Sequence, residues 1–468
     1  MRQSSTLEIL FCFCLVTAQA QSPSSSSPQL TPQAAYDQAT RPLDITRRSP
    51  QNWSEVELAA LKIATDQAKA DCASRSPDQF TGEDLLAYAR LCALGQEWKP
   101  VEQAASNYLN AQKAATPVER VIESRGLATA FDYEVQASLR LKNPERALLA
   151  AQTMLRTVPY DDLTSEATTS TVHYLQLIHT DQALALLAQR QPILLSLLRA
   201  HVASSTQALS SSHLTIPLRA LYAEAIAFPA MQQFANQTEA AAAAFAELEA
   251  TLPASLSPDD AVFIAESRRQ YLLLGSHLPT ITTFAWLPDP AGIPPEINTN
   301  FGSATVFLLF PDWCNQCVAL HPNFMPVSKR LRENDARFFA LLAQANPLPK
   351  VVPKDVTKAV NNTGPSGAVS KPARIAPFSG GRPDIPHVEL QLNIKPTAAA
   401  LLVGTPTFVV PSQTLNSFVA TDFPLIVVVD HNGIIRSIQV APDNAMVPGG
   451  VVDQIVDHVV NQWPPPKP

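Results

Sequence analysis

The chain has 468 residues, enough for about two or three domains. Hydrophobic residues make up 46% and charged residues 16%, so the chain can bury a core and a wholly disordered protein is excluded. The net charge of −7 argues against a basic nucleic-acid-binding protein. Six cysteines are too few for a dense disulfide scaffold in a chain of this length, so their positions matter more than their number.

The first twenty residues have the layout of a secretory signal peptide. Arg2 precedes an apolar run over 9–18, and an Ala-x-Ala cleavage pattern ends at Ala20. The alternative is an ordinary core helix at the amino terminus. Cleavage would remove Cys12 and Cys14, and no later stretch reaches the roughly 18 apolar residues that span a bilayer. We therefore expect an exported protein, periplasmic or extracellular and soluble after cleavage, in which disulfides persist.

Residues 21–52 are rich in Ser, Pro and Gln and show no helical or strand periodicity, which predicts a flexible linker. From 53 to 278 the pattern is helical. Thr81 and Asp84 fit a capping box at the start of one helix, and Gly95 is placed to end it.

Two helical hairpins are predicted further along, with turns at 142–144 and 178–181. An alanine follows each turn at a similar offset, Ala147 in one and Ala183 in the other. This region resembles degenerate tetratricopeptide (TPR) repeats, in which stacked helix pairs bury faces that no single pair can bury. The resemblance implies a helical domain that binds a protein; a plain helical bundle is the alternative.

Cys72 and Cys92 lie in the helical region, and in an exported protein a structural disulfide is the first expectation. If the turn lies near Ser76 and Pro77, however, the two cysteines are offset by about 15 Å along the helix axis. A disulfide needs Cα atoms within roughly 7 Å of each other. Two interpretations stay open: a disulfide, or two buried small apolar side chains.

A Pro-rich stretch over 277–300 marks the boundary of a second domain, which we place at 279–468. Its apolar run over 304–310 is typical of a central buried strand. The sequence Trp-Cys-Asn-Gln-Cys follows at 313–317, and a helical stretch then runs to about Arg332.

The two cysteines of this motif are suited to thiol–disulfide exchange, which needs an accessible thiolate. A cysteine at a helix N-terminus has a lowered pKa, because unpaired N–H groups stabilise the negative charge. We therefore predict Cys314 as the nucleophile and Cys317 as the resolving thiol. A zinc site would need more ligands than His321 supplies nearby, so we expect no metal and no cofactor.

The strand, the Trp-Cys-x-x-Cys motif and the helix resemble the thioredoxin fold, most closely its secreted TlpA-like thiol–disulfide oxidoreductases. Pro322 matches the helix-kinking proline of that family. An apolar strand over 425–430, an Asn-Gly turn, a second strand over 434–438 and a helix over 450–462 match its closing order. The resemblance implies an α/β domain after the all-α, TPR-like one.

By the same resemblance, Pro424 is the cis-proline that packs beside the redox cysteines, and Trp313 and Phe423 support the substrate groove. Pro406, within 404–408, is a competitor for the cis-proline. We prefer Pro424, because the terminal hairpin and helix follow it at the expected distance.

Three features depart from the family. Leu308 stands where thioredoxins often carry a buried Asp, the flank over 318–320 lacks the Arg and Glu common in TlpA-like proteins, and the residues between the cysteines lack the usual proline. Redox direction therefore cannot be carried over. Between a second strand, predicted over 337–344, and the closing elements lies a Pro-rich insertion at 346–386, where little structure is expected.

The leading hypothesis is an exported oxidoreductase that acts on protein thiols and disulfides, with a helical domain that binds a protein and no nucleic-acid partner. A reductase would also need a membrane electron donor. The alternative is an envelope scaffold whose thioredoxin-like domain is catalytically silent. A peroxide-reducing enzyme is disfavoured, because the nucleophile of that class usually lies in a Thr-x-x-Cys context, unlike Cys314.

Overall fold

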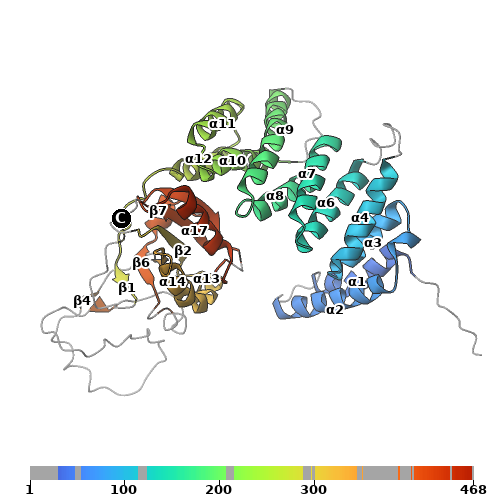
Figure 1. Ribbon diagram of the computed structural model, residues 1–468, viewed down its shortest axis with the longest axis horizontal. Helices are drawn as coiled ribbons and strands as arrows, with labels where there is room; N and C mark the ends of the chain where they lie inside the picture. Colours follow the sequence, from blue (N-terminus) through green and yellow to red (C-terminus); the bar gives the residue numbers. More distant parts are fainter. Residues whose placement is uncertain are drawn as a thin grey trace, which may run out of the picture. The chain divides into compact units, whose positions relative to one another are not determined.

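The computed structural model describes residues 30–47, 54–113, 124–206, 216–287, 297, 301–344, 350–351, 388–389, 402, 405–442 and 445–465. The predicted signal peptide and nearly all of the predicted insertion lie outside these ranges. The chain forms two compact units, Met1–Ala104 and Ala105–Pro468. The described part of the first unit is helical, whereas the second unit contains helices and a mixed β-sheet (Figure 1).

The first unit is built on small side chains. Its elements are α1 (Pro32–Arg47), α2 (Ser54–Ala73), the 3-10 turn η1 (Pro77–Gln79), α3 (Glu83–Leu94) and the start of α4 (Trp98–Gln112). Ala35, Ala39, Ala68 and Leu91 form a buried cluster where α1 meets α2 and α3. A Cβ at Gly95 would lie 2.6 Å from the backbone N of Lys69, so a glycine is required where α2 and α3 approach.

Helix α1 corrects the prediction of a flexible linker over 21–52, which is wrong for residues 32–47. The Thr31 hydroxyl accepts a hydrogen bond from the Ala34 N–H at 3.2 Å, and Pro32 occupies the first helical position. Ala35, Ala39 and Leu43 recur every fourth residue and are buried. The apolar stripe is narrow and mostly alanine, so the surrounding Ser, Pro and Gln residues hid it in the sequence.

The predicted capping box at Thr81 is also wrong. The residue that precedes α3 is Gly82, and it makes no side-chain capping bond. A capping box forms one turn earlier, where Gln79 Oε1 accepts from the Ser76 N–H at 3.2 Å and opens η1. Ser76 and Gln79 carry the same three-residue spacing as Thr81 and Asp84, and the proline after Ser76 favours the earlier site.

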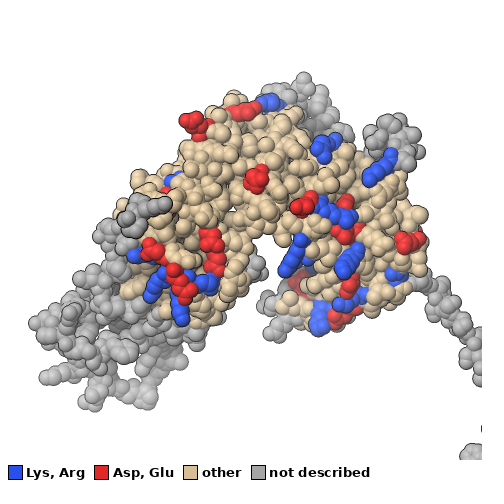
Figure 2. Space-filling model, viewed as in Figure 1, with Lys and Arg blue, Asp and Glu red and all other residues tan. Residues whose placement is uncertain are grey.

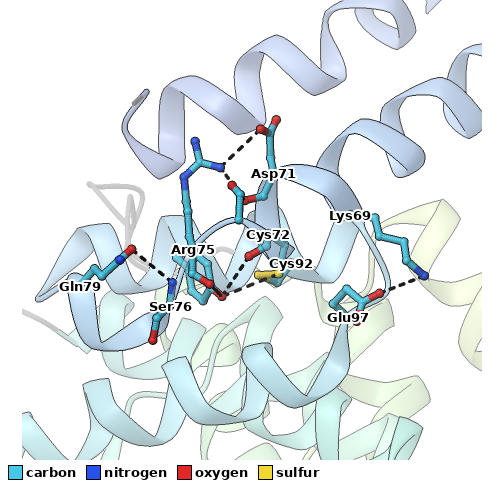
Figure 3. Close-up of a disulfide and its surroundings, with 10 residues drawn as sticks. Lys69, Asp71, Cys72, Arg75, Ser76, Gln79, Cys92 and Glu97 are labelled. Carbon is cyan, nitrogen blue, oxygen red and sulfur yellow. Dashed lines mark hydrogen bonds and ion pairs between the residues drawn. A yellow bond between two sulfur atoms is a disulfide. The ribbon is translucent and has the colours of Figure 1, made fainter. Parts of the chain in front are cut away.

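A disulfide joins Cys72 to Cys92 (Figure 3), with their Cα atoms 5.1 Å apart. The offset of about 15 Å expected from a tight turn near Ser76 is therefore wrong. The connection over 74–82 is long and contains η1, so the start of α3 is displaced from the end of α2. The C-terminal ends of α2 and α3 thereby come together.

Two polar contacts around this disulfide hold the same ends in place. Lys69 Nζ lies 3.0 Å from Glu97 Oε1, just beyond the end of α3. The Tyr88 hydroxyl donates to the carbonyl of Arg75 at 3.2 Å. Both half-cystines are almost completely buried, with 1% and 0% exposure, so this bond is a structural cross-link between helices.

The second unit begins within α4 and continues with a run of helices: α6 (Ser124–Arg140), α7 (Pro144–Thr157), α8 (Asp162–Leu175), α9 (Thr180–Thr206), α10 (Leu218–Phe234), α11 (Thr238–Ala250) and α12 (Pro258–Leu273). The predicted turns at 142–144 and 178–181 are confirmed. Asn143 Oδ1 accepts from the Arg146 N–H at 3.3 Å and caps α7. Ala147 and Ala183 are fully buried, as their positions after the turns predict.

A buried polar cluster ties α8, α9 and α10 together. Glu224 on α10 accepts hydrogen bonds from the Ser165 hydroxyl, at 2.7 Å, and from the Tyr160 hydroxyl. Arg190 on α9 lies 3.7 Å from the same carboxylate and donates to the Thr169 hydroxyl at 2.9 Å. Burial raises the pKa of Tyr160, so its phenol stays protonated and donates.

The main sheet has the strand order β1-β6-β3-β2-β7-β8. Its strands are β1 (Ala285–Trp286), β2 (Ala304–Pro311), β3 (Arg337–Gln344), β6 (Thr407–Pro411), β7 (Leu425–Asp430) and β8 (Ile435–Val440). Strands β2, β3 and β6 are mutually parallel, whereas β1 pairs antiparallel with β6, β7 with β2, and β8 with β7. A separate pair joins β4 (Lys350–Val351) to β5 (Val388–Glu389).

The strands predicted from the sequence over 304–310, 337–344, 425–430 and 434–438 are confirmed. All of β2 is buried, as expected for a central strand. Strand β6 was not predicted, because its start at Thr407 lies within the stretch interpreted as a possible cis-proline loop.

Short helices cover the sheet: α13 (Asn315–Ala319), the 3-10 turn η2 (His321–Asn323), α14 (Phe324–Arg332), α16 (Gln413–Ser417) and α17 (Val451–Gln462). Helix α14 packs on β3, and α17 packs on β2 and β7. Helix α17, predicted over 450–462, buries Val452, Ile455, Val456 and Val459. The chain thus combines a helical part with an α/β part, as predicted. Positive and negative side chains are interspersed on the face seen in Figure 2.

The β7–β8 hairpin is closed by a buried carboxylate. Asp430 is fully buried; its Oδ1 accepts from the Ile434 N–H at 3.0 Å, and its Oδ2 accepts from Arg436 Nε at 2.8 Å. Gly433 adopts a positive φ of 73°, and a Cβ there would collide with the Phe301 ring. The predicted Asn-Gly turn is therefore present for a steric reason as well as a conformational one.

The helices of the second unit join the sheet at the end that holds this turn. After α12, the Gly275 N–H donates to the Ile435 carbonyl and the Leu278 N–H to the Gly433 carbonyl, both at 2.8 Å. The His458 ring of α17 stacks on Phe234 of α10 with centroids 3.9 Å apart. Because β7 runs antiparallel to β2, this end is opposite the one where β2 leads into the cysteine motif.

Candidate functional site

Strand β2 delivers the cysteine motif to one end of the sheet. Beyond its last residue, Pro311, the Asp312 N–H donates to the Ala343 carbonyl of β3 at 3.0 Å. The chain then turns, and the Cys314 N–H donates back to the Pro311 carbonyl at 3.1 Å. This turn places Cys314 at the N-cap of α13.

Cys314 and Cys317 form a disulfide, with Cα atoms 5.3 Å apart. The Cys317 N–H donates to Cys314 Sγ at 3.3 Å. Cys314 retains 8% exposure, whereas Cys317 is fully buried. Both residues are thus largely shielded from solvent, and Cys314 is the less completely buried of the two.

The helical stretch predicted from the cysteines to about Arg332 is interrupted. Instead of one helix to Arg332, α13 ends at Ala319, η2 contains Pro322, and α14 follows. Since α13 is only five residues long, its dipole is small. Stabilisation of a Cys314 thiolate would come from local N–H groups, such as that of Cys317, rather than from a long helix.

The Phe423–Pro424 peptide bond is cis, as the sequence interpretation predicts for Pro424. This loop lies beside the cysteine motif, because the Trp313 and Phe423 rings meet edge to face with centroids 5.7 Å apart. Trp313 is 68% exposed, so most of its side chain faces solvent next to the cysteine motif.

Pro406, the competing cis-proline, is not among the cis bonds of the described residues. Its carbonyl accepts from the Ala340 N–H at 2.8 Å, and the next residue, Thr407, begins β6 beside β3. Pro406 therefore belongs to the sheet rather than to a loop at the cysteines.

Leu308 and His321 were also singled out in the sequence. Leu308 is fully buried inside β2 and contributes only to the core. His321 lies in η2, four residues beyond Cys317. Within the described part of the chain, no group of three or more His, Cys, Asp or Glu side chains is arranged to hold a metal ion.

One unusual carboxyl group in the helical part escaped the sequence analysis. Asp132 on α6 is 5% exposed; its Oδ2 accepts from Gln136 Nε2 at 2.6 Å, but its Oδ1 has no partner. Burial, helped by the nearby Glu166 and Asp161 carboxylates, raises its pKa to about 7, against the opposing Gln136 bond. Helical periodicity predicts on which face of α6 Asp132 lies, but not that this face is buried.

Comparison with protein-family models, curated proteins and solved structures gives no match to this chain. Among the described residues, no helix is both long enough and apolar enough to cross a membrane. The geometry of the cysteine site and the resemblance of its motif are therefore the features that bear on function.

Proposed function

We propose that the protein is an exported, thioredoxin-like thiol–disulfide oxidoreductase that acts on protein disulfides, and that its TPR-like helical region binds a protein partner. The observation that carries the proposal is the unequal exposure of Cys314 and Cys317 beside Trp313 and the cis-proline Pro424. Cys314, the less completely buried of the two residues, is the nucleophile, and Cys317 resolves the intermediate.

In the reducing direction, the Cys314 thiolate attacks one sulfur of a partner disulfide and expels the other sulfur as a thiolate. The Cys317 thiolate then attacks Cys314 Sγ, which breaks the intermolecular bond and releases the second partner thiolate. The partner gains two electrons, and the Cys314–Cys317 disulfide forms. A dithiol donor, supplied through the membrane, must reduce this disulfide again. Oxidation of a partner dithiol is the same sequence in reverse.

The cis-proline loop has a positioning role in this scheme. The Pro424 carbonyl already accepts from the Ala441 N–H at 2.8 Å, which anchors the loop to the chain beyond β8. Phe423 and Trp313 flank the nucleophile and give an incoming polypeptide an apolar surface to contact.

The second candidate is an envelope scaffold with a silent α/β domain. Leu308 favours it, because a fully buried apolar side chain at that position cannot accept the proton that Cys317 must lose.

A trapping experiment separates the two functions. In the Cys317→Ala variant, oxidoreductase chemistry stops at the mixed disulfide, so Cys314 should retain partners that are released by dithiothreitol. The Cys314→Ala variant is the matched control and should retain none. If Cys317→Ala captures no partner and the purified protein reduces no protein disulfide, the scaffold function is the correct one.

A further inference from the structure

The surface around Cys314 contains an aromatic corner with a carboxylate beside it. Trp313 and Phe423 meet at an interplanar angle of 89°, and Trp313 is 68% exposed. Asp422 directly precedes Phe423 and is exposed, with Oδ2 accepting from the Thr421 hydroxyl at 3.2 Å. Cys314, Trp313 and Asp422 thus lie on two loops that touch through the aromatic contact.

The two loops are poor in basic side chains: His321 lies in one, and Arg269 donates to the Asn416 carbonyl just before the other. The cysteine loop, 311–323, and the cis-proline loop, 418–424, contain no Lys or Arg in the sequence, whereas each contains one Asp. The nearest positive side chains along α14 are in its last turn, at Lys329, Arg330 and Arg332. Arg330 is already committed there, because its Nε lies 2.8 Å from Asp453 Oδ2.

An exposed indole and a carboxylate on the adjoining loop are two groups that can together bind a cation. Lys and Arg side chains stack on aromatic faces through cation–π attraction, most strongly on Trp. The carboxylate forms an ion pair with a basic side chain and repels an acidic one. It therefore favours basic segments and disfavours acidic segments. The same protein already shows this stacking elsewhere, where Arg436 lies 4.2 Å from the centroid of the Trp463 ring.

We propose that the site selects polypeptides that carry Arg or Lys next to the cysteine that Cys314 engages. The basic side chain stacks on Trp313 and pairs with Asp422 while the partner sulfur meets Cys314 Sγ. This inference rests on the proposed oxidoreductase function, because it names the substrate chemistry of the same cysteine pair. The exchange itself is unchanged: two electrons pass between the Cys314–Cys317 pair and the partner cystine.

The test compares three cystine peptides of equal length that differ only in the residues flanking the cysteines: Arg, Gln or Glu. The wild-type protein should reduce the Arg peptide with a kcat/KM about tenfold above that of the Glu peptide, with Gln between them. The preference should shrink as salt is raised, because exposed charge pairs are screened.

Two variants assign the preference to these residues. Asp422→Asn should reduce the Arg-to-Glu ratio about threefold, and Trp313→Leu should weaken selection for the Arg peptide by a similar factor. Asp259→Asn, an exposed carboxylate at the start of α12, is the matched control and should leave the ratio unchanged. Equal rates for the three peptides, or a ratio unchanged in Asp422→Asn, would overturn the proposal.

A binding measurement separates this inference from the proposed function. Peptides with Ser in place of Cys cannot exchange, so their affinity is measured by the change in Trp313 fluorescence against the Trp313→Leu background. Tighter binding of the Arg peptide without any exchange of the cystine peptides would support the cation site and reject the oxidoreductase. Equal binding of the Arg and Glu peptides would reject the cation site, whatever the exchange rates.

Discussion

Among the residues that the structure describes, the helical part and the α/β part each contain one disulfide and one buried aspartate, but these lie in different surroundings. Cys72–Cys92 joins residues twenty positions apart, whereas Cys314–Cys317 spans three. The first pair is buried between helices, and in the second pair Cys314 retains 8% exposure just beyond the end of a strand. The two disulfides therefore differ in loop length and in surroundings, and we expect the first to stabilise the fold and the second to exchange with partner thiols.

The two buried aspartates differ in how completely their carboxylate oxygens are hydrogen-bonded. Asp430 in the α/β part has partners for both carboxylate oxygens, including Arg436. Asp132 in the helical part has one oxygen without a partner, and its pKa is raised to about 7. One aspartate closes a hairpin, and the other makes the stability of its helix packing depend on pH.

The largest expected effect is on exchange activity. Cys314→Ala should lower disulfide-exchange activity more than 100-fold, because the attacking sulfur is lost. The double variant Cys72→Ala/Cys92→Ala should keep most of the activity. Insulin reduction measured on both variants checks this. Equal losses of exchange activity in the two variants would contradict the different roles expected for the two disulfides.

Mild reduction should separate the same two bonds by rate. A low concentration of dithiothreitol should reduce Cys314–Cys317 at least roughly 100-fold faster, because Cys72–Cys92 becomes accessible only when its helices open locally. Alkylation followed by peptide mass spectrometry identifies which cysteines are labelled. Simultaneous labelling of all four would show that the helical disulfide is not protected.

For the free energy of unfolding, loss of the Cys72–Cys92 disulfide should have the larger effect. Cys72→Ala/Cys92→Ala should lower the free energy of unfolding by about 3 kcal/mol, because an open chain of this loop length gains conformational entropy when unfolded. Cys314→Ala/Cys317→Ala should cost less, since its loop is much shorter. Urea unfolding followed by circular dichroism measures both, and a larger loss in the second variant would contradict the comparison.

The smallest expected effect concerns the aspartates. Asp132→Asn should stabilise the protein by about 1–2 kcal/mol above pH 7, because a buried charge is removed. Asp430→Asn should destabilise it, because the Arg436 ion pair is broken.

The pH dependence gives a second readout for Asp132. Between its ordinary value of 3.8 and about 7, the folded state keeps a proton that the unfolded state releases. This group therefore makes stability fall as pH rises through that window and level off above it. Asp132→Asn should remove this slope in thermal melts taken from pH 4 to 8; an unchanged slope would assign it to other groups.

The sequence by itself determined the elements whose signals are local. The apolar run into Cys314, the Asn-Gly hairpin around Gly433 and the turn at 142–144 are each encoded by neighbouring residues. Their periodicity and turn chemistry need no distant partner to be interpreted.

Only the tertiary structure decided which distant residues meet. The long connection over 74–82 brings Cys72 to Cys92, and the alanine stripe of α1 becomes a helix face because α2 and α3 cover it. The contact between Trp313 and Phe423 likewise arises from the pairing of β2 with β7. The physical reason is that burial and long-range pairing depend on the path of the chain, which local patterns do not specify.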